Sequence, residues 1–76
     1  MNPKIEILMA TYNGEKYIED QINSIINQTY KNWTLLIRDD GSKDKTLDII
    51  KKYEKVDKRI ILLRDNKNNF IFHHVL

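Results

Sequence analysis

The sequence is poor in the residues that punctuate or cross-link a chain: its 76 residues include no cysteine, one proline and two glycines. Without cysteine, neither a disulfide nor a thiolate zinc site can compensate for a small core. A domain of this size buries only about 60% of the surface that its unfolded chain exposes. We therefore expect a single small domain of marginal stability.

An excess of charge of one sign is also missing. The chain has 13 lysines and arginines against 11 aspartates and glutamates, a net charge of +2, and the two signs are interspersed. This balance is too weak and too scattered to indicate nucleic-acid binding. The apolar runs are too short for a signal peptide core or a membrane span, so we expect a cytoplasmic chain without a transmembrane segment.

Three short apolar runs are present, and they predict β-strands over residues 5–9, 33–38 and 59–64. The first is nearly all apolar between Pro3 and the Asn13-Gly14 pair, and the second, "WTLLIR", is aromatic, aliphatic and β-branched. Their lengths suit strands better than helices.

Two helical patterns separate these runs. Ile18, Ile22 and Ile25 recur at helical spacing and predict a helix over residues 14–27, with Asn13 as its N-cap. A second helix is predicted over residues 44–55, since Leu47, Ile50 and Tyr53 have the same spacing. Its N-cap would be Ser42 or Asp44.

The order βαβαβ predicts an α/β fold with a parallel sheet of strand order 3-2-1, half of a Rossmann-like layer. Right-handed crossovers would place both helices on the same face. The other face would then be uncovered, and the outer edge of the first strand would be unpaired. The fold is therefore predicted to be incomplete. We expect the chain to associate through this face, where the exposed apolar side chains would be Leu8, Leu36, Ile61 and Leu63.

Ligands of open α/β sheets bind outside the carboxyl ends of the strands. Here these ends lead into "ATYNG", residues 10–14, and "DDGS", residues 39–42, which should lie side by side. Tyr12 could stack on a flat ring while Asp39 or Asp40 accepts its N–H group, as uracil would require. A buried donor without an acceptor costs about 1 to 3 kcal/mol, which would provide base selectivity.

The spacing alone leaves other interpretations of Asp39 and Asp40 open. They could simply organise the turn into the second helix, since aspartate accepts backbone N–H groups and Gly41 permits unusual dihedral angles. They could also bind a metal, but two adjacent carboxylates diverge and supply too few oxygens. We therefore assign no metal ligand.

Other chemistry is disfavoured. There is no GxGxxG or GxxxxGK[ST] pattern, and Glu15 and Asp44 at the helix starts would repel an anion. His73 and His74 are adjacent but have no organised third ligand, so we interpret them as tail residues. No hydrolytic triad can be assembled, and no catalytic residue is assigned.

Residues 7–46, "ILMATYNGEKYIEDQINSIINQTYKNWTLLIRDDGSKDKT", resemble the N-terminal signature of family 2 glycosyltransferases with the GT-A fold. The segments "TYNG", "QTY" and "DDGSKDKT" occur together at the family's spacing. The resemblance implies inverting transfer of a sugar from a nucleotide diphosphate sugar, of UDP or dTDP type, to an acceptor.

The resemblance also implies which residues bind the nucleotide. Ala10 would contribute its backbone, Tyr12 would stack on the base and Asp40 would contact it, while Asp39 would have a more structural role. The family's Asp-x-Asp motif, which binds Mg²⁺ or Mn²⁺, and its catalytic base lie further along the chain. Nothing after Asp65 supplies either of them.

We therefore expect residues 1–65 to be the N-terminal part of a family 2-like domain and residues 66–76 to be a divergent tail, because the resemblance is lost near Phe70. The chain would be a truncated fragment with negligible transfer activity. The alternative is a non-catalytic βαβαβ module that binds a nucleotide or a protein partner.

Overall fold

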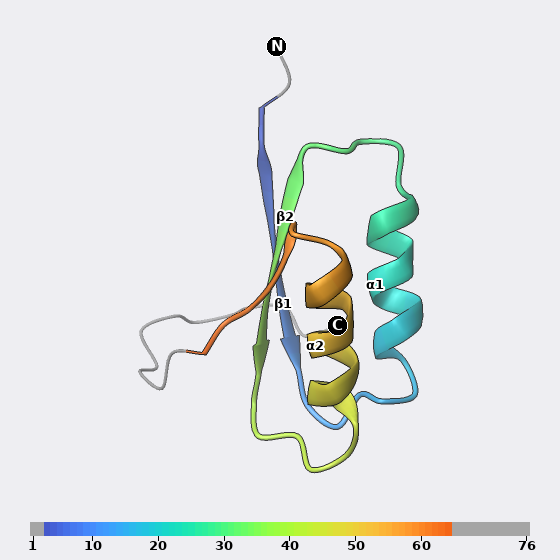
Figure 1. Cartoon of the computed structure of the whole chain (residues 1–76), viewed down its shortest axis with the longest axis vertical. Helices are drawn as coiled ribbons and strands as arrows, with labels where there is room; N and C mark the ends of the chain where they lie inside the picture. Colours follow the sequence, from blue (N-terminus) through green and yellow to red (C-terminus); the bar gives the residue numbers. More distant parts are fainter. Residues whose placement is uncertain (1–2, 65–76) are drawn as a thin grey trace.

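The computed structural model describes residues 3–64 and has the alternating strand and helix order that the sequence predicts (Figure 1). The expected divergent tail, which contains His73 and His74, lies outside the described residues. The elements are, in chain order, β1 (Ile5–Thr11), α1 (Ile18–Asn27), β2 (Trp33–Asp39), α2 (Thr46–Val56) and β3 (Ile60–Leu62).

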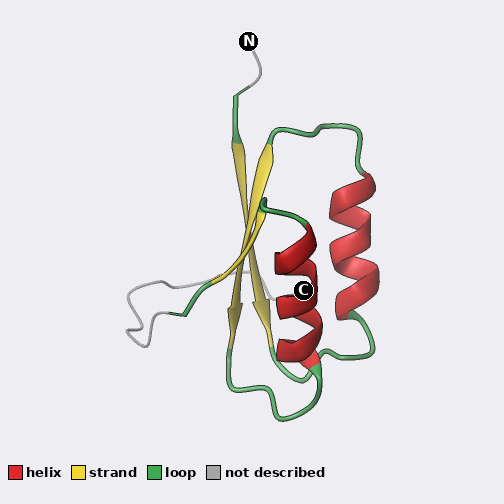
Figure 2. Ribbon diagram, viewed as in Figure 1, coloured by secondary structure: helices red, strands yellow, loops and turns green. Residues whose placement is uncertain are grey.

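The three strands form one parallel sheet with β2 in the centre, between β1 and β3. Both helices cover the same face of this sheet (Figure 2). The predicted α/β class, strand order and placement of the helices are therefore confirmed. Neither helix in the described part of the chain has the length and apolar character needed to cross a lipid bilayer.

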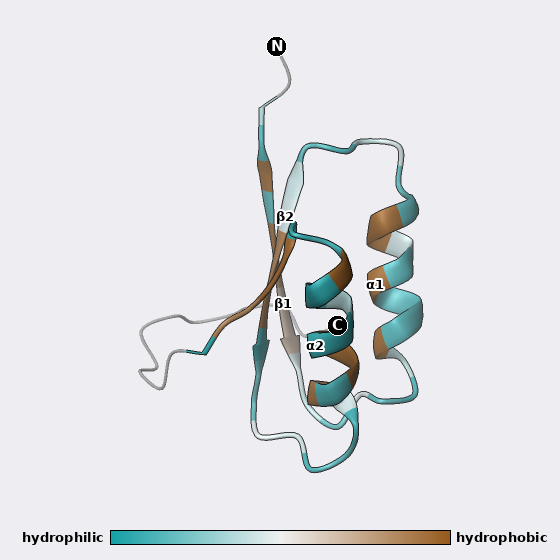
Figure 3. Ribbon diagram, in the orientation of Figure 1, coloured by the Kyte–Doolittle hydropathy of each residue, from teal (hydrophilic) through white to brown (hydrophobic). Residues whose placement is uncertain are grey.

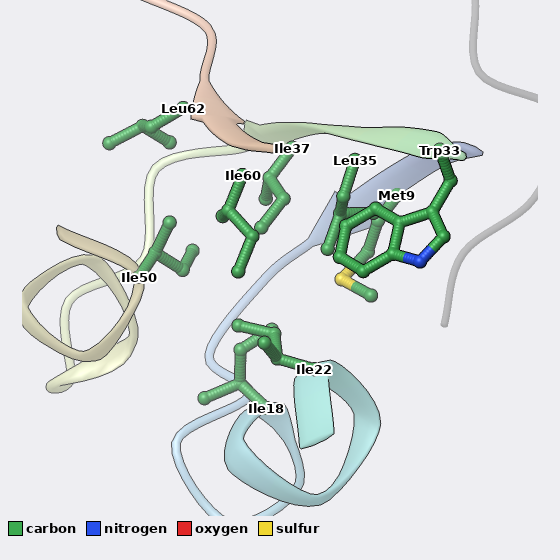
Figure 4. Packing of buried hydrophobic residues seen from close by; sticks show 9 residues of the cluster. All are labelled: Met9, Ile18, Ile22, Trp33, Leu35, Ile37, Ile50, Ile60 and Leu62. Carbon is green, nitrogen blue, oxygen red and sulfur yellow. The ribbon is translucent and has the colours of Figure 1, made fainter. Parts of the chain in front are cut away.

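The core lies between the sheet and the two helices (Figure 4). Alternate residues of the strands point toward the helices, as the two-residue period of a strand requires. Apolar residues recur along both helices, as the brown segments of Figure 3 show, and Ile18, Ile22 and Ile50 point toward the strand residues in Figure 4. The buried apolar residues are Met9, Ile18, Ile22, Trp33, Leu35, Ile37, Ile50, Ile60 and Leu62.

No described helix covers the opposite face of the sheet (Figure 2). Leu8, Leu36 and Ile61 are paired in register across the three strands and form one row on it. Leu8 is 47% exposed and Ile61 is 39% exposed, whereas Leu36 and Leu63 are half-buried. Within the described part of the chain, the predicted uncovered face is therefore present, and its apolar side chains are most exposed at the outer strands.

The first helix begins later than predicted. It starts at Ile18, because residues 15–17 form a turn in which the Gly14 carbonyl accepts the N–H groups of Tyr17 and Ile18, at 2.9 and 2.8 Å. Asn13 is not its N-cap; Tyr17 occupies that position without a side-chain capping bond. The amide oxygen of Asn13 is instead bonded to the loop after β2.

The second helix begins at Thr46, two residues later than predicted. Lys45 occupies its N-cap position and makes no side-chain capping bond. Asp44 still accepts the N–H group of Thr46 at 2.9 Å, so its predicted bond to the helix start is present just outside the helix. Ser42 does not cap the helix, since its hydroxyl group donates to Asp39.

Candidate functional site

The two loops that follow β1 and β2 lie side by side at the same end of the sheet (Figure 1). The parallel register pairs Thr11 with Asp39, so both strands end at the same level. The N–H group of Asp40 continues the ladder by donating to the Thr11 carbonyl at 2.8 Å. The predicted proximity of the two loops is therefore confirmed.

Asp39 is half-buried, and both of its carboxylate oxygens accept hydrogen bonds. Oδ1 accepts from the hydroxyl groups of Thr11, at 2.7 Å, and Ser42, at 2.6 Å. Oδ2 accepts the Ser42 N–H group at 2.8 Å. Asp39 thus connects β1 to the loop after β2.

Asp40 is in different surroundings, although it is the next residue. Its side chain is exposed, and no hydrogen bond joins its carboxylate to another residue of the described part. The chain turns immediately after it at Gly41, whose φ is +79°. The geometry therefore leaves the Asp40 carboxylate facing solvent, where it can accept from a ligand.

Tyr12 is 59% exposed in the loop between β1 and α1. Tyr17 is also exposed, at 64%, and it precedes α1 instead of belonging to it. Ala10 is half-buried near the end of β1. A hollow of about 300 Å³ is lined by Thr11, Tyr12, Asn13, Gly14, Tyr17, Ile18 and Gln21.

A second hollow, of about 420 Å³, lies at the carboxyl ends of β2 and β3 and is lined by Asp39, Gly41, Leu47, Lys51, Leu62, Leu63 and Arg64. Asp40 lines neither hollow. A planar ligand between Tyr12 and Asp40 would therefore lie across the two loops instead of entering a closed cavity.

The described residues do not fit a divalent cation. Both oxygens of Asp39 already accept hydrogen bonds from the protein, so at the ends of β1 and β2 the Asp40 carboxylate is the more available ligand. Within residues 3–64, no three histidine, aspartate or glutamate side chains gather closely enough to hold a metal. Mg²⁺ and Mn²⁺ require several oxygen ligands, so we assign no chemical step through a metal to these residues.

Comparison of the sequence with known proteins identifies its family. The sequence model of the family described as glycosyl transferase family 2 matches residues 6–72. An uncharacterized glycosyltransferase of Haemophilus influenzae is 43% identical over 92% of this chain and 21% of its own length. The putative teichuronic acid biosynthesis glycosyltransferase TuaG of Bacillus subtilis is 39% identical over 84% of this chain and 26% of its own length.

A further relative is the putative glycosyltransferase EpsE of Bacillus subtilis, 43% identical over 88% of this chain and 24% of its own length. The chain thus spans between 21% and 26% of the length of these curated relatives. The family match continues beyond residue 65.

Proposed function

We propose that this chain, which belongs to glycosyl transferase family 2, binds the nucleoside of a nucleotide diphosphate sugar at the two loops that follow β1 and β2. The observation that supports this most directly is the contrast between two neighbouring carboxylates. Asp39 is bonded within the protein, whereas Asp40 faces solvent beside the loop that carries Tyr12.

The chemistry of this pair suits uracil or thymine. Both bases carry a ring N–H donor between two carbonyl groups, which an Asp40 carboxylate can accept while Tyr12 stacks on the ring. Cytosine has an acceptor at the equivalent position and would oppose the carboxylate. The backbone of Ala10 would border the base. The cytoplasmic location, and the choice between UDP and dTDP, stay predictions.

Sugar transfer with inversion, supported by Mg²⁺ or Mn²⁺, is proposed for a complete family domain. Since the chain spans only 21% to 26% of the length of its curated relatives, we expect the 76-residue chain alone to show negligible transfer. The alternative function, a non-catalytic binding module, is favoured by the uncovered sheet face. Detectable transfer by the purified chain with a nucleotide sugar and manganese would contradict the first expectation.

Calorimetric titration of the folded chain with UDP tests nucleoside binding. Asp40→Asn should weaken the Kd for UDP by about tenfold, because a hydrogen bond to a charged group contributes about 1.5 to 3 kcal/mol. Its Tm should stay unchanged, since the Asp40 side chain is exposed. Asp39→Asn should weaken UDP binding less than Asp40→Asn does. It should lower the Tm, because one of the groups that donate to Asp39 loses its acceptor.

Glu6→Gln is the matched control, since Glu6 is an exposed carboxylate near the opposite end of β1. It makes the same change of charge and should leave the Kd for UDP unchanged. CDP should bind more weakly than UDP to the wild-type chain. A folded chain that does not bind UDP, or an Asp40→Asn variant with the wild-type Kd, would refute the proposal.

A further inference from the structure

The loops after β1 and β2 are joined by hydrogen bonds in both directions, and Asn13 makes two of them. Its backbone N–H group donates to the Ser42 hydroxyl at 2.7 Å, and its side-chain Oδ1 accepts the Lys43 N–H group at 2.9 Å. Asn13 thus contacts the other loop through both its backbone and its side chain.

The next two residues continue this pattern. The Gly14 N–H group donates to the Thr46 hydroxyl at 2.8 Å, and the Glu15 N–H group donates to Asp44 Oδ2 at 3.2 Å. In return, Glu15 Oε1 accepts the Lys45 N–H group at 3.4 Å. We call the set of residues 13–15 and 42–46 the loop clasp.

Asn13 has a φ of +46°, which makes it the one non-glycine residue in the left-handed region within residues 3–64. This conformation is unfavourable for most L-residues but accessible to asparagine. The two bonds to Ser42 and Lys43 hold it there. Because Asn13 directly follows Tyr12, its backbone sets the direction in which the chain leaves the tyrosine.

The clasp therefore connects the two parts of the proposed nucleoside site. Tyr12 lies next to Asn13 on one loop, and Asp40 lies three residues before Lys43 on the other. If the loops were held less firmly, ligand binding would have to order them, which lowers affinity.

We propose that Asn13 is a positioning residue, whose side chain, by bonding the Lys43 backbone, fixes Tyr12 relative to Asp40 before the nucleotide binds. The inference rests on the proposed function, because it concerns the same site. Asn13 itself need not touch the ligand. The "TYNG" and "DDGSKDKT" segments would then serve largely to hold two contact residues in place.

Two substitutions of Asn13 distinguish the contribution of its side-chain hydrogen bond from that of its backbone conformation. Asn13→Gly keeps the left-handed conformation accessible and removes the amide oxygen. Asn13→Asp keeps an oxygen that can accept from Lys43. We expect Asn13→Gly to weaken the Kd for UDP by about three- to tenfold and to accelerate hydrogen exchange of the Lys43 amide in NMR spectra. In Asn13→Asp, the Kd and the exchange rate of the Lys43 amide should both be close to the wild-type values.

Uridine is titrated alongside UDP, so that repulsion between the carboxylate introduced by Asn13→Asp and the diphosphate is not mistaken for a failed rescue. Asn27→Gly is the matched control, since Asn27 is exposed at the last position of α1, and it should leave the Kd unchanged. The Tm of each variant shows whether it remains folded.

The outcomes distinguish the two proposals. A wild-type chain that is folded but binds neither UDP nor uridine overturns the proposed function together with this inference. If the wild-type chain binds and Asn13→Gly binds equally well, the positioning role alone is overturned. Faster Lys43 exchange with an unchanged Kd overturns it as well, because the clasp would then stabilise the loops without affecting the site.

Discussion

At the carboxyl end of β2, two consecutive aspartates have side chains in different surroundings. Asp39 is the last strand residue, and its carboxylate binds the Thr11 hydroxyl of the neighbouring strand. Asp40 has left the strand, and its side chain is exposed. The alternation of side chains along a strand explains why only one of the two reaches Thr11. The two adjacent aspartates therefore differ in how available their carboxylates are to a ligand.

The backbone conformation of Gly41 predicts the effect of substituting this residue. Its φ is +79°, and a Cβ atom added there would meet nothing within 4 Å. Gly41→Ala should therefore destabilise the chain through its backbone conformation and not through a clash. We expect a loss of about 1 to 2 kcal/mol in the free energy of unfolding, measured by urea denaturation.

Gly14→Ala is the control for this prediction. A Cβ atom at Gly14 would also meet nothing within 4 Å, but Gly14 has no positive φ. Its free energy of unfolding should change by no more than about 0.5 kcal/mol, or rise slightly because the unfolded chain loses freedom. Equal losses in both variants would show that the left-handed conformation is not the cause.

The sequence allowed the loops that carry Tyr12 and the two aspartates to be placed side by side, because the strand order and the rule for strand ends determine which loops meet. It did not allow the role of Asn13 to be predicted. Asparagine before a helical pattern favours an N-cap, but here its oxygen bonds Lys43, 30 residues away. Such a bond depends on the tertiary structure. The late start of α1 also leaves Tyr17 outside the helix, where it is exposed.

Among the elements of the sheet, β3 is the strand least stabilised by backbone pairing, because it has only three residues. Side-chain bonds from α2 compensate for its short ladder. Glu54 accepts the Leu62 N–H group at 2.9 Å and pairs with Arg64 at 2.7 Å. At the start of β3, the Arg59 guanidinium pairs with Asp57 and lies 3.9 Å from the centre of the Trp33 ring.

These bonds predict how stability depends on pH. The Arg64 guanidinium, and then the Leu62 N–H group, hold the pKa of Glu54 below its ordinary value, and Arg59 lowers the pKa of Asp57. A carboxylate with a depressed pKa in the folded state stabilises the fold above its unfolded pKa, about 4. This stabilisation disappears as the pH falls through the folded pKa. The Tm should therefore decrease as the pH falls from about 5 to about 3.

Glu54→Gln tests the contribution of one group to this dependence. The amide keeps an acceptor for Leu62 but loses the charge that pairs with Arg64. Its Tm should be lower than that of the wild-type chain at neutral pH and should fall less on acidification. Glu6→Gln, remote from β3, should leave the shape of the curve unchanged. Parallel curves for Glu54→Gln and the wild-type chain would exclude this role for Glu54.

For the whole molecule, the alternation of apolar runs and helical stripes was sufficient to predict the class, the strand order and the uncovered face. All three depend on patterns that extend over many residues and tolerate errors at element ends. The ends themselves were less predictable: β1 continues to Thr11 and β3 stops at Leu62, two residues beyond and two residues short of the apolar runs. Pairing with β2, and not composition, sets these limits.

The uncovered sheet face predicts how the whole molecule behaves in solution. Leu8 and Ile61 lie at the two ends of one row across the sheet, and both are exposed in spite of their apolar side chains. Exposed apolar patches and unpaired strand edges favour association. We propose that the isolated chain associates with itself through this face. Sedimentation velocity over a range of concentrations should show species larger than a monomer.

Substituting both residues, Leu8→Thr with Ile61→Thr, should shift the population toward monomer while keeping the strand preference of each position. The Tm at concentrations where the chain is monomeric should change little, since neither side chain is buried in the single chain. Val56→Thr is the matched control: Val56 is 78% exposed on α2, away from the sheet face, and its loss should not affect association. A wild-type chain that remains monomeric, or a control that dissociates as readily as the double variant, would contradict association through the sheet.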